Sequence, residues 1–292
     1  MPSTRASGRP RYGTLVIVGG HEDKTGERVI HRALVHRLGG GGLAIATVAS
    51  EQPDALWREY AALFRTLGVA DVRHLAIASR AEADAPEAMA ALDGVRGVFF
   101  TGGDQLRITG LLGGTLAAER IRDVYETGGL VGGTSAGASV MSVTMLVSGA
   151  AEESHRLGGS LRMAPGLGLL PDVIVDQHFA ERGRVGRLLG AVAQNPTILG
   201  VGIDENTAVL VEQAPDAPCF RVVGEGGVFV VDGQGASYTN VSEEEENRTL
   251  SLFGVRLHVL SQGDEFDLAS RTPTNHPAEE VDAALGLRDG AS

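Results

Sequence analysis

Ser135 and its glycine neighbours form the stretch whose residue types and spacing most directly suggest chemistry. Residues 132–139 read Gly-Gly-Thr-Ser-Ala-Gly-Ala-Ser and follow a short apolar run. This matches the Gly-x-Ser-x-Gly pattern of a nucleophile elbow, a sharp turn between a strand and a helix. Such a turn aims the amide of Ala136 at a developing oxyanion, at a helix N-terminus that favours negative charge. Because five-residue patterns also arise by chance, the rest of the chain must distinguish a nucleophile from an ordinary loop.

A serine nucleophile needs a base within hydrogen-bond reach and an acid that orients the base. Of the eight histidines, His178 ends a predicted strand in the later part of the chain, and we favour it as the base. His21 also follows a strand and is the alternative. Glu205, or its neighbour Asp204, follows a third strand and is the candidate acid. The chain order Ser, His, Glu differs from that of the α/β-hydrolases and disfavours that fold.

A second glycine turn, Thr-Gly-Gly-Asp-Gln at residues 101–105, separates an apolar run from a predicted helix. Free amides at a helix N-terminus bind anions, so the glycine pair 102–103 is a candidate for the second half of an oxyanion hole beside Ala136. A simple N-cap by Asp104 is the structural alternative, and it is compatible with that role.

Apolar runs and amphipathic segments alternate along the first half of the chain, which predicts βαβ units. We expect an α/β fold with a mostly parallel sheet and helices on both faces, and ligands at the carboxyl ends of the strands. After the serine we expect a helix over 138–145, a glycine-rich loop over 157–170, and a helix to about Ala193 that carries three arginines. The shorter alternating segments after Cys219 indicate antiparallel strands appended to the same sheet.

Composition limits the possible partners and locations. The formal net charge of −12 argues against a nucleic-acid partner. No apolar run is long enough to span a membrane, and residues 1–12 lack the apolar core of a signal peptide. A lone cysteine excludes an internal disulfide and a multi-cysteine metal site, and cytoplasmic location is the default expectation. We expect a disordered tail over 1–12, a single α/β domain over 13–272, and a loose tail over 273–292.

Four separated motifs resemble the cyanophycinases, serine exopeptidases of the dipeptidase E-like clan. The motifs are residues 132–138, residues 100–105, residues 176–179 with the arginines that follow, and residues 202–208. The resemblance runs from about Gly13 to Thr272. It implies a three-layer fold like that of the class I glutamine amidotransferases, a single peptidase domain, a homodimer, and no metal or cofactor.

The resemblance also implies a role for individual residues. Ser135 would be the nucleophile, His178 the general base and acid, and Glu205 the carboxylate that orients His178. The amides of Gly103 and Ala136 would hold the oxyanion. The implied pocket is lined by Gln105, Asp176, Gln177, Arg182, Arg184 and Arg187.

The substrate implied by the resemblance is cyanophycin, a poly-aspartate backbone whose side chains carry isopeptide-linked arginine. The implied products are β-aspartyl-arginine dipeptides. Guanidinium groups of the protein suit the free arginine carboxylate of each repeat, and Asp176 or another carboxylate suits its guanidinium. The spacing of Arg182, Arg184 and Arg187 cannot place all three on one helical stripe, which leaves at least one free to be ordinary surface, and a loop over part of the run is the alternative.

Two alternatives remain open at this stage. One is a related aspartyl or β-aspartyl dipeptidase of the same clan. The other is a non-catalytic, amidotransferase-like sensor, which would predict a broken triad, whereas Ser135, His178 and Glu205 are all present.

Overall fold

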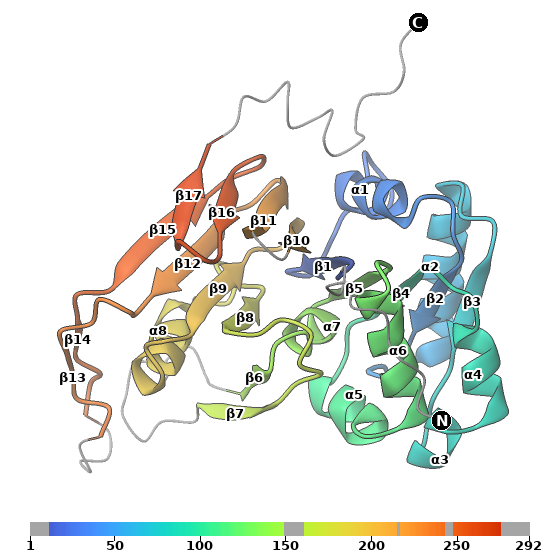
Figure 1. The fold of residues 1–292 in the computed structure, drawn as a ribbon, viewed down its shortest axis with the longest axis horizontal. Coiled ribbons are helices and arrows are strands. Elements are labelled where there is room, and N and C mark those ends of the chain that lie inside the picture. The colour runs from blue at the N-terminus through green and yellow to red at the C-terminus, as the bar shows by residue number, and fades with distance from the viewer. Residues whose placement is uncertain (1–11, 149–160, 215–216, 243–247, 276–292) are drawn as a thin grey trace, which may run out of the picture.

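Two β-sheets meet side by side in the computed structural model, which describes residues 12–148, 161–214, 217–242 and 248–275 (Figure 1). The larger sheet has nine strands in the order β17-β16-β11-β10-β1-β5-β4-β2-β3. Its strands are β1 (Thr14–Val18), β2 (Leu43–Ala46), β3 (Val72–Leu75), β4 (Gly97–Phe100), β5 (Leu130–Thr134), β10 (Thr207–Ala214), β11 (Ala217–Gly224), β16 (Glu265–Asp267) and β17 (Thr272–Thr274). Strands β1 to β5 are parallel, and the other four run antiparallel to their neighbours.

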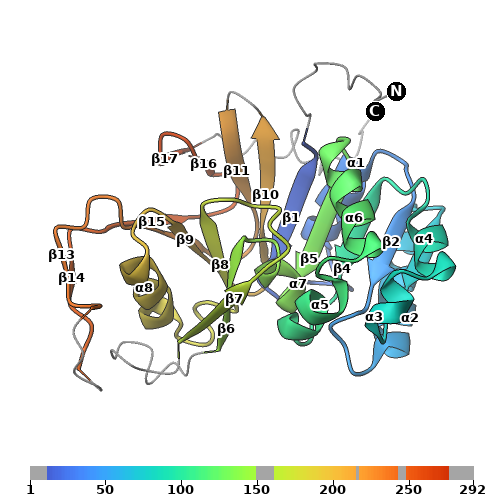
Figure 2. The ribbon, with the colours of Figure 1, turned by 60° about the horizontal axis from the view of Figure 1, so that its bottom comes forward.

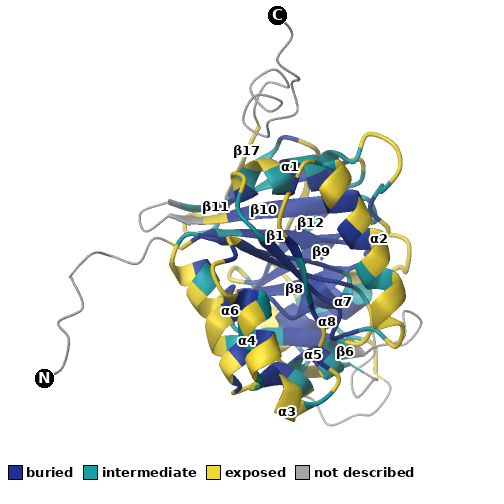
Figure 3. Cartoon of the chain, turned by 90° about the vertical axis from the view of Figure 1, so that its right-hand side faces the viewer, coloured by how far each residue is buried: buried dark blue, intermediate teal, exposed yellow. Residues whose placement is uncertain are grey.

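Helices cover both faces of this sheet, as the sequence predicts. They are α1 (Val29–Leu38), α2 (Pro53–Thr66), α3 (Arg80–Ala83), α4 (Pro86–Leu92), α5 (Gln105–Leu112) and α6 (Leu116–Glu126). Val16 faces α1 and α2 in one buried cluster, whereas its neighbour Leu15 faces α4 to α6 in another. Successive strand side chains point to opposite faces, so each strand joins both layers. Figure 3 shows the buried strands between helices whose outer sides are exposed.

A second sheet has the strand order β15-β12-β9-β8 and lies beside the first (Figure 2). Its strands are β8 (Val173–Gln177), β9 (Leu199–Ile203), β12 (Val228–Asp232) and β15 (Arg256–Leu260). Helix α8 (Val185–Gln194) packs on it through Leu188 and Val192. The expectation that all late antiparallel strands extend one sheet is therefore wrong for β12 and β15. The turn at residues 224–227, with Gly224 at φ 120°, leads the chain from β11 in the first sheet to β12 in the second.

The helix expected over 138–145 is shorter in the structure. Helix α7 (Ala136–Ser139) ends early, and strand β6 (Thr144–Ser148) pairs with β7 (Arg162–Pro165). The carbonyls of Val140 and Met141 accept hydrogen bonds from Leu167 and Leu169. These bonds occupy the acceptors that a longer helix would use. The first part of the expected 157–170 loop, residues 157–160, lies outside the described residues.

Three smaller features complete the fold. Strands β13 (Tyr238–Thr239) and β14 (Leu252–Phe253) form a short hairpin. Strand β17 spans the expected domain boundary at Thr272, because residues 272–274 pair with β16. Among the helices that the structure describes, none combines the length and the hydropathy needed to cross a bilayer.

Candidate active site

Ser135 lies in a strained turn between β5 and α7. Its backbone has φ 53° and ψ −108°, a conformation that residues other than glycine rarely adopt. A Cβ on Gly133 would lie 2.5 Å from the carbonyl oxygen of Gly137, and a Cβ on Gly137 would lie 2.6 Å from that of Phe100, so close backbone approach requires both glycines. The amide of Ser135 donates to Val18 O of β1 at 3.0 Å, which fixes the turn on the neighbouring strand. The local geometry is that of the elbow predicted from the sequence.

His178 contacts both Ser135 and Glu205. Its Nε2 lies 3.0 Å from Ser135 Oγ, and its Nδ1 lies 2.6 Å from Glu205 Oε1. An ionised carboxylate only accepts hydrogen bonds, so Nδ1 carries the proton and Nε2 is free to accept from the serine hydroxyl. The structure thus brings together the three side chains that the sequence singles out as a triad.

The structure also separates the alternatives for base and acid. His21 contacts Glu205 through Nδ1 at 3.1 Å, while the Ser135 hydroxyl is bonded to His178. Asp204 accepts from the amides of Ala180 and Gly227, at 2.9 and 3.0 Å. Its carboxylate therefore supports the loops around the site, and Glu205 is the acid that reaches His178.

Backbone hydrogen bonds hold the ends of the two sheets together at this point. The amide of His178 donates to Gly19 O at 2.8 Å, and the amide of Asn206 donates to Gly20 O at 2.9 Å. A Cβ on Gly20 would lie 2.3 Å from His178 Cε1, so the histidine ring packs directly on the backbone after β1. Residues from β1, β5, β8 and β9 thus meet because the carboxyl ends of all four strands converge.

The environment of His178 suits a base at neutral pH. Burial lowers the pKa of His178, the nearby Arg182 and His21 lower it further, and Glu205 opposes them. Partial burial raises the pKa of Glu205, but its hydrogen bond with His178 and the nearby His21 and Arg182 outweigh this effect and lower it. The result is a neutral imidazole beside an ionised carboxylate, which is the protonation state that proton abstraction from a serine requires.

The glycine turn after β4 lies against the elbow. A Cβ on Gly102 would lie 3.6 Å from the Cβ of Ser135, and Gly103 has φ 144°. A Cβ on Gly103 would lie 2.2 Å from Ala49 O, so only glycine fits there. Asp104 caps α5 by accepting from the amide of Leu106 at 2.8 Å. The cap by Asp104 thus coexists with a glycine turn that contacts the serine at Gly102, and the oxyanion role of Gly103 stays a prediction.

The predicted pocket residues Asp176 and Arg187 are buried and paired with each other. Arg187 Nε donates to Asp176 Oδ2 at 2.9 Å, and Arg187 Nη2 donates to Oδ1 at 2.5 Å. Neither side chain reaches the surface. In this structure Asp176 therefore has no carboxylate edge free for a substrate guanidinium, contrary to the expectation from the sequence.

Arg184 and Gln177 extend the hydrogen-bond network of this ion pair. Arg184 Nη1 donates to Asp176 Oδ1 at 3.1 Å and to Gln177 Oε1 at 2.5 Å, and the Gln177 amide donates to Ser139 Oγ at 3.3 Å. Helix α8 begins at Val185, so Arg184 belongs to the turn before the helix. Burial lowers the pKa of Arg184 to about 10, although Asp176 opposes this effect, and its side chain stays charged at neutral pH.

Arg182 and Gln105 occupy different surroundings. Arg182 lies in the same turn as Arg184, and it is exposed. Gln105 begins α5, and its amide donates to the carbonyls of Leu146 and Val147 in β6, at 3.1 and 3.2 Å. Gln105 thus ties α5 to β6. Of the three arginines, Arg182 is the one fully available to a ligand, whereas Arg187 is structural.

A buried carboxylate that our sequence analysis missed lies beneath the elbow. Glu22 accepts hydrogen bonds from Thr134 Oγ1 at 2.7 Å and from Tyr60 OH at 2.5 Å, and His31 Nε2 lies 3.8 Å away. Burial raises the pKa of Glu22, but these three neighbours outweigh it and lower the pKa to about 2. Because Thr134 precedes Ser135, the Glu22 carboxylate anchors the strand end that carries the serine. An acidic residue in the turn shortly after the buried strand β1, which ends at Val18, was the available signal.

We expect Glu22→Gln to destabilise the protein at neutral pH. A folded pKa of about 2 against an ordinary value near 4.5 corresponds to about 3 kcal/mol of stability above pH 4.5. This contribution is lost as the pH falls from about 4.5 to about 2, since the carboxylate then becomes protonated in the folded state. Urea unfolding at several pH values should show a less stable variant with a flatter pH dependence in this range.

The exposed Glu126 at the end of α6 provides a matched control. Glu126→Gln should change the free energy of unfolding by no more than about 0.5 kcal/mol. Equal stability of the two variants at neutral pH would contradict an anchoring role for Glu22.

Known proteins resemble this chain along most of its length. A family model described as peptidase family S51 matches residues 15–215. A cyanophycinase from Synechococcus elongatus is 41% identical over 259 residues, which cover 88% of this chain and 79% of that protein. A cyanophycinase from Geminocystis herdmanii is 37% identical over 263 residues, which cover 89% of this chain and 95% of that protein. The crystal structure of a peptidase from an acI-B1 actinobacterium has the same fold, with a TM-score of 0.65, 21% identity, and coverage of 89% of this chain and 98% of that one.

Proposed function

The chain belongs to peptidase family S51, and from this membership we propose that it is a serine exopeptidase that hydrolyses cyanophycin to β-aspartyl-arginine dipeptides. The observation that carries the proposal is the continuous hydrogen-bonded series Ser135–His178–Glu205, with distances of 3.0 and 2.6 Å. The cyanophycinases from Synechococcus elongatus and Geminocystis herdmanii support the choice of substrate.

The proposed reaction is acyl transfer through Ser135. Its Oγ attacks the main-chain carbonyl of an aspartyl residue that bears arginine, and His178 Nε2 takes the hydroxyl proton. Glu205 stabilises the imidazolium that forms, and the amides of Gly103 and Ala136 stabilise the oxyanion. The imidazolium then gives its proton to the leaving amine. Water activated by the same histidine hydrolyses the acyl-enzyme and restores Ser135.

We propose that Arg182 and Arg184 recognise the free α-carboxylate of the arginine in each repeat. Arg182 is exposed in the turn that follows His178, and Arg184 is partly exposed above the buried Asp176–Arg187 pair. Guanidinium groups bind carboxylates through paired hydrogen bonds. In this proposal the pocket is shaped by Gln105 and Gln177. It is supported by Asp176 and Arg187, which are buried beneath it.

We expect Arg182→Gln to raise the KM for cyanophycin about tenfold, the effect of losing one charge-assisted hydrogen bond worth about 1.4 kcal/mol. Stability should stay unchanged because the Arg182 side chain is exposed. The exposed Arg120 on α6 is the control, and Arg120→Gln should leave KM at the wild-type value. Steady-state kinetics that give one KM for both variants would contradict the assignment.

The test of the proposed function is release of soluble dipeptide from insoluble cyanophycin by the purified protein. Dipeptide release at a rate proportional to enzyme concentration supports the proposal. Cleavage of small aspartyl or β-aspartyl dipeptides with no attack on the polymer would assign the related dipeptidase activity. If neither substrate is cleaved, the non-catalytic sensor becomes the better description.

The finer expectations from the sequence stay predictions. We propose a homodimer in the cytoplasm, with a single peptidase domain over residues 13–272 and tails outside it, on the basis of the resemblance and the composition. Light scattering coupled to size-exclusion chromatography should give twice the chain mass. A monomer of full activity would contradict the dimer.

A further inference from the structure

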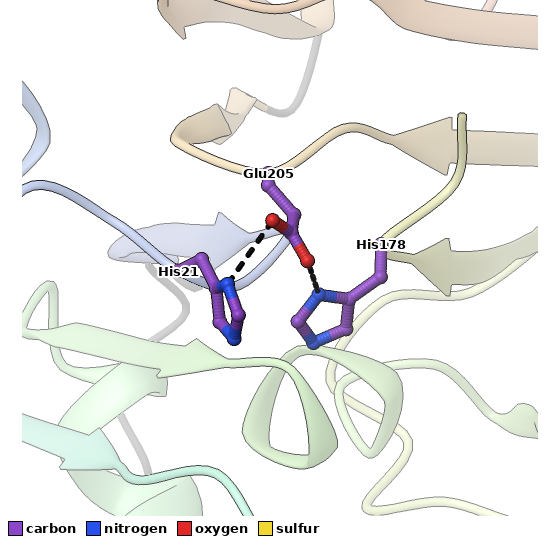
Figure 4. A group of neighbouring side chains, drawn as sticks. All are labelled: His21, His178 and Glu205. Carbon is purple, nitrogen blue, oxygen red and sulfur yellow. Dashed lines mark hydrogen bonds and ion pairs between the residues drawn. The ribbon is translucent and has the colours of Figure 1, made fainter. Parts of the chain in front are cut away.

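His21 shares the carboxylate of Glu205 with His178. Its Nδ1 lies 3.1 Å from Glu205 Oε2, while His178 Nδ1 lies 2.6 Å from Oε1 (Figure 4). The two imidazole rings are 5.2 Å apart between centroids and nearly perpendicular. The His21 side chain is 74% exposed, whereas that of His178 is 4% exposed. The proposed reaction gives His21 no role.

Two imidazoles and a carboxylate that converge on one point form a donor set typical of zinc sites. His21, His178 and Glu205 each offer one ligand atom, and these atoms lie within 4.8 Å of one another. We propose that these three residues form a binding site for Zn²⁺ at the active site, and that zinc inhibits the enzyme. The binding stands on the geometry alone, while the inhibition rests on the proposed function.

The ligand atoms, which lie within 4.8 Å of one another, must move to the separations of a tetrahedral site to accept the ion. Zinc–nitrogen and zinc–oxygen distances of about 2.0–2.2 Å in a tetrahedron separate neighbouring ligand atoms by about 3.3–3.5 Å. His21 Nδ1 and Glu205 Oε2, at 3.1 Å, are already close to that separation. The His178–Glu205 hydrogen bond of 2.6 Å must lengthen by less than about 1 Å. Exposure of His21 leaves an open path to solvent, and water would complete the tetrahedron.

Coordination at His178 Nδ1 would remove the base by changing its tautomer. A metal binds the lone pair of a ring nitrogen, so the proton on Nδ1 must move through solvent to Nε2. The neutral ring then has an N–H group facing Ser135 and can no longer accept the hydroxyl proton. The same ion takes Glu205 away from its role beside the imidazole. Zinc therefore disables two members of the triad in one reversible step, without loss or gain of protons by the rings.

The donor set predicts selectivity among cations. Two imidazole nitrogens favour Zn²⁺, whereas Mg²⁺ and Ca²⁺ prefer oxygen ligands and would find a single carboxylate here. Millimolar Mg²⁺ should therefore neither bind the site nor inhibit.

The direct test is calorimetric titration of Zn²⁺ into Ser135→Ala, which keeps all three ligands and does not require turnover. We expect one zinc ion per chain. The double variant that adds His21→Ala to Ser135→Ala should bind zinc at least about 10–100-fold more weakly. Removal of a residue that only hydrogen-bonds to a metal ligand already causes a loss of this size. His36→Ala is the matched control, because His36 is an exposed histidine on α1. Equal zinc affinity in the His21 and His36 variants would overturn the site.

The kinetic test measures the rate of each enzyme relative to its own zinc-free rate. Zinc should inhibit the wild type and His36→Ala alike, with recovery after EDTA, and His21→Ala should need at least about tenfold more zinc for the same inhibition. If the wild type cleaves no substrate, the proposed function is wrong. The zinc site still holds in that case if the Ser135→Ala variant binds zinc and the added His21→Ala substitution abolishes this binding. An active wild type whose zinc inhibition is unchanged by His21→Ala would overturn the inference.

Discussion

Ser135→Ala should lower the rate of cyanophycin hydrolysis by at least about 10⁴-fold, because it removes the only atom that forms the acyl-enzyme in the proposed mechanism. The loss should appear in kcat, since the arginines and the glycine turn that would bind substrate are untouched. Alanine is smaller than serine, and the backbone turn is held by the Ser135 amide bonded to Val18 O. Thermal unfolding should therefore stay close to that of the wild type. Dipeptide release measured by chromatography gives the rate.

A nearby serine provides the control for this experiment. Ser142 is buried, and its hydroxyl has no hydrogen-bond partner among the described residues. Ser142→Ala should keep full activity. If Ser135→Ala retained more than about one part in a hundred of the wild-type rate, water would be reacting directly and the acyl-enzyme mechanism would be wrong.

The first half of the fold could be predicted because each segment carries its own signal. The alternation of apolar runs with amphipathic helices indicated parallel βαβ units, and the structure has β1 to β5 parallel with helices on both faces. The predicted cap was equally local, because Asp104 accepts a hydrogen bond from the first turn of α5. The predicted family resemblance and peptidase class are confirmed by the family model and by the similar cyanophycinases.

The second sheet could not be predicted, because strand partners depend on contacts distant in sequence. The apolar residues of strand β12 are compatible with pairing to β11 or to β9, and in the structure the strand pairs with β9 after the turn at Gly224. The same limit applies to Asp176 and Arg187. Eleven residues separate them, and their types alone fit a pocket as well as an internal ion pair. Burial, which the sequence does not state, makes the pair internal.

The convergence of Ser135, His178 and Glu205 was predictable because the carboxyl ends of parallel strands lie at the same edge of a sheet. Ser135, His178 and Glu205 each follow a strand, and the carboxyl ends of these strands meet at one edge. The competing roles of His21 and Asp204 were not separable, since both also follow strands. Their hydrogen bonds separate them: Asp204 accepts from two backbone amides, and His21 reaches only the second oxygen of Glu205. Side-chain direction at a strand end is a property of the tertiary fold.

Glu205→Gln should lower kcat by about 10²–10⁴-fold, because the amide retains a hydrogen-bond acceptor for His178 Nδ1 but no charge to stabilise the imidazolium. The Glu205 carboxylate raises the pKa of His178, so its removal should lower that pKa. The acidic limb of the kcat/KM profile should therefore move to lower pH, even though the maximum rate falls. A purely structural role for Glu205 would reduce the rate without moving this limb.

Asp204→Asn is the matched comparison, since it changes the neighbouring carboxylate in the same way. Asp204 accepts from the amides of Ala180 and Gly227, so its loss should destabilise the fold by about 1–3 kcal/mol. The pH profile of the folded enzyme should stay where it is in the wild type, because Asp204 does not contact His178. If instead Asp204→Asn moved the acidic limb and Glu205→Gln did not, the orienting acid would be Asp204, and the 2.6 Å contact between Glu205 and His178 would have no catalytic consequence.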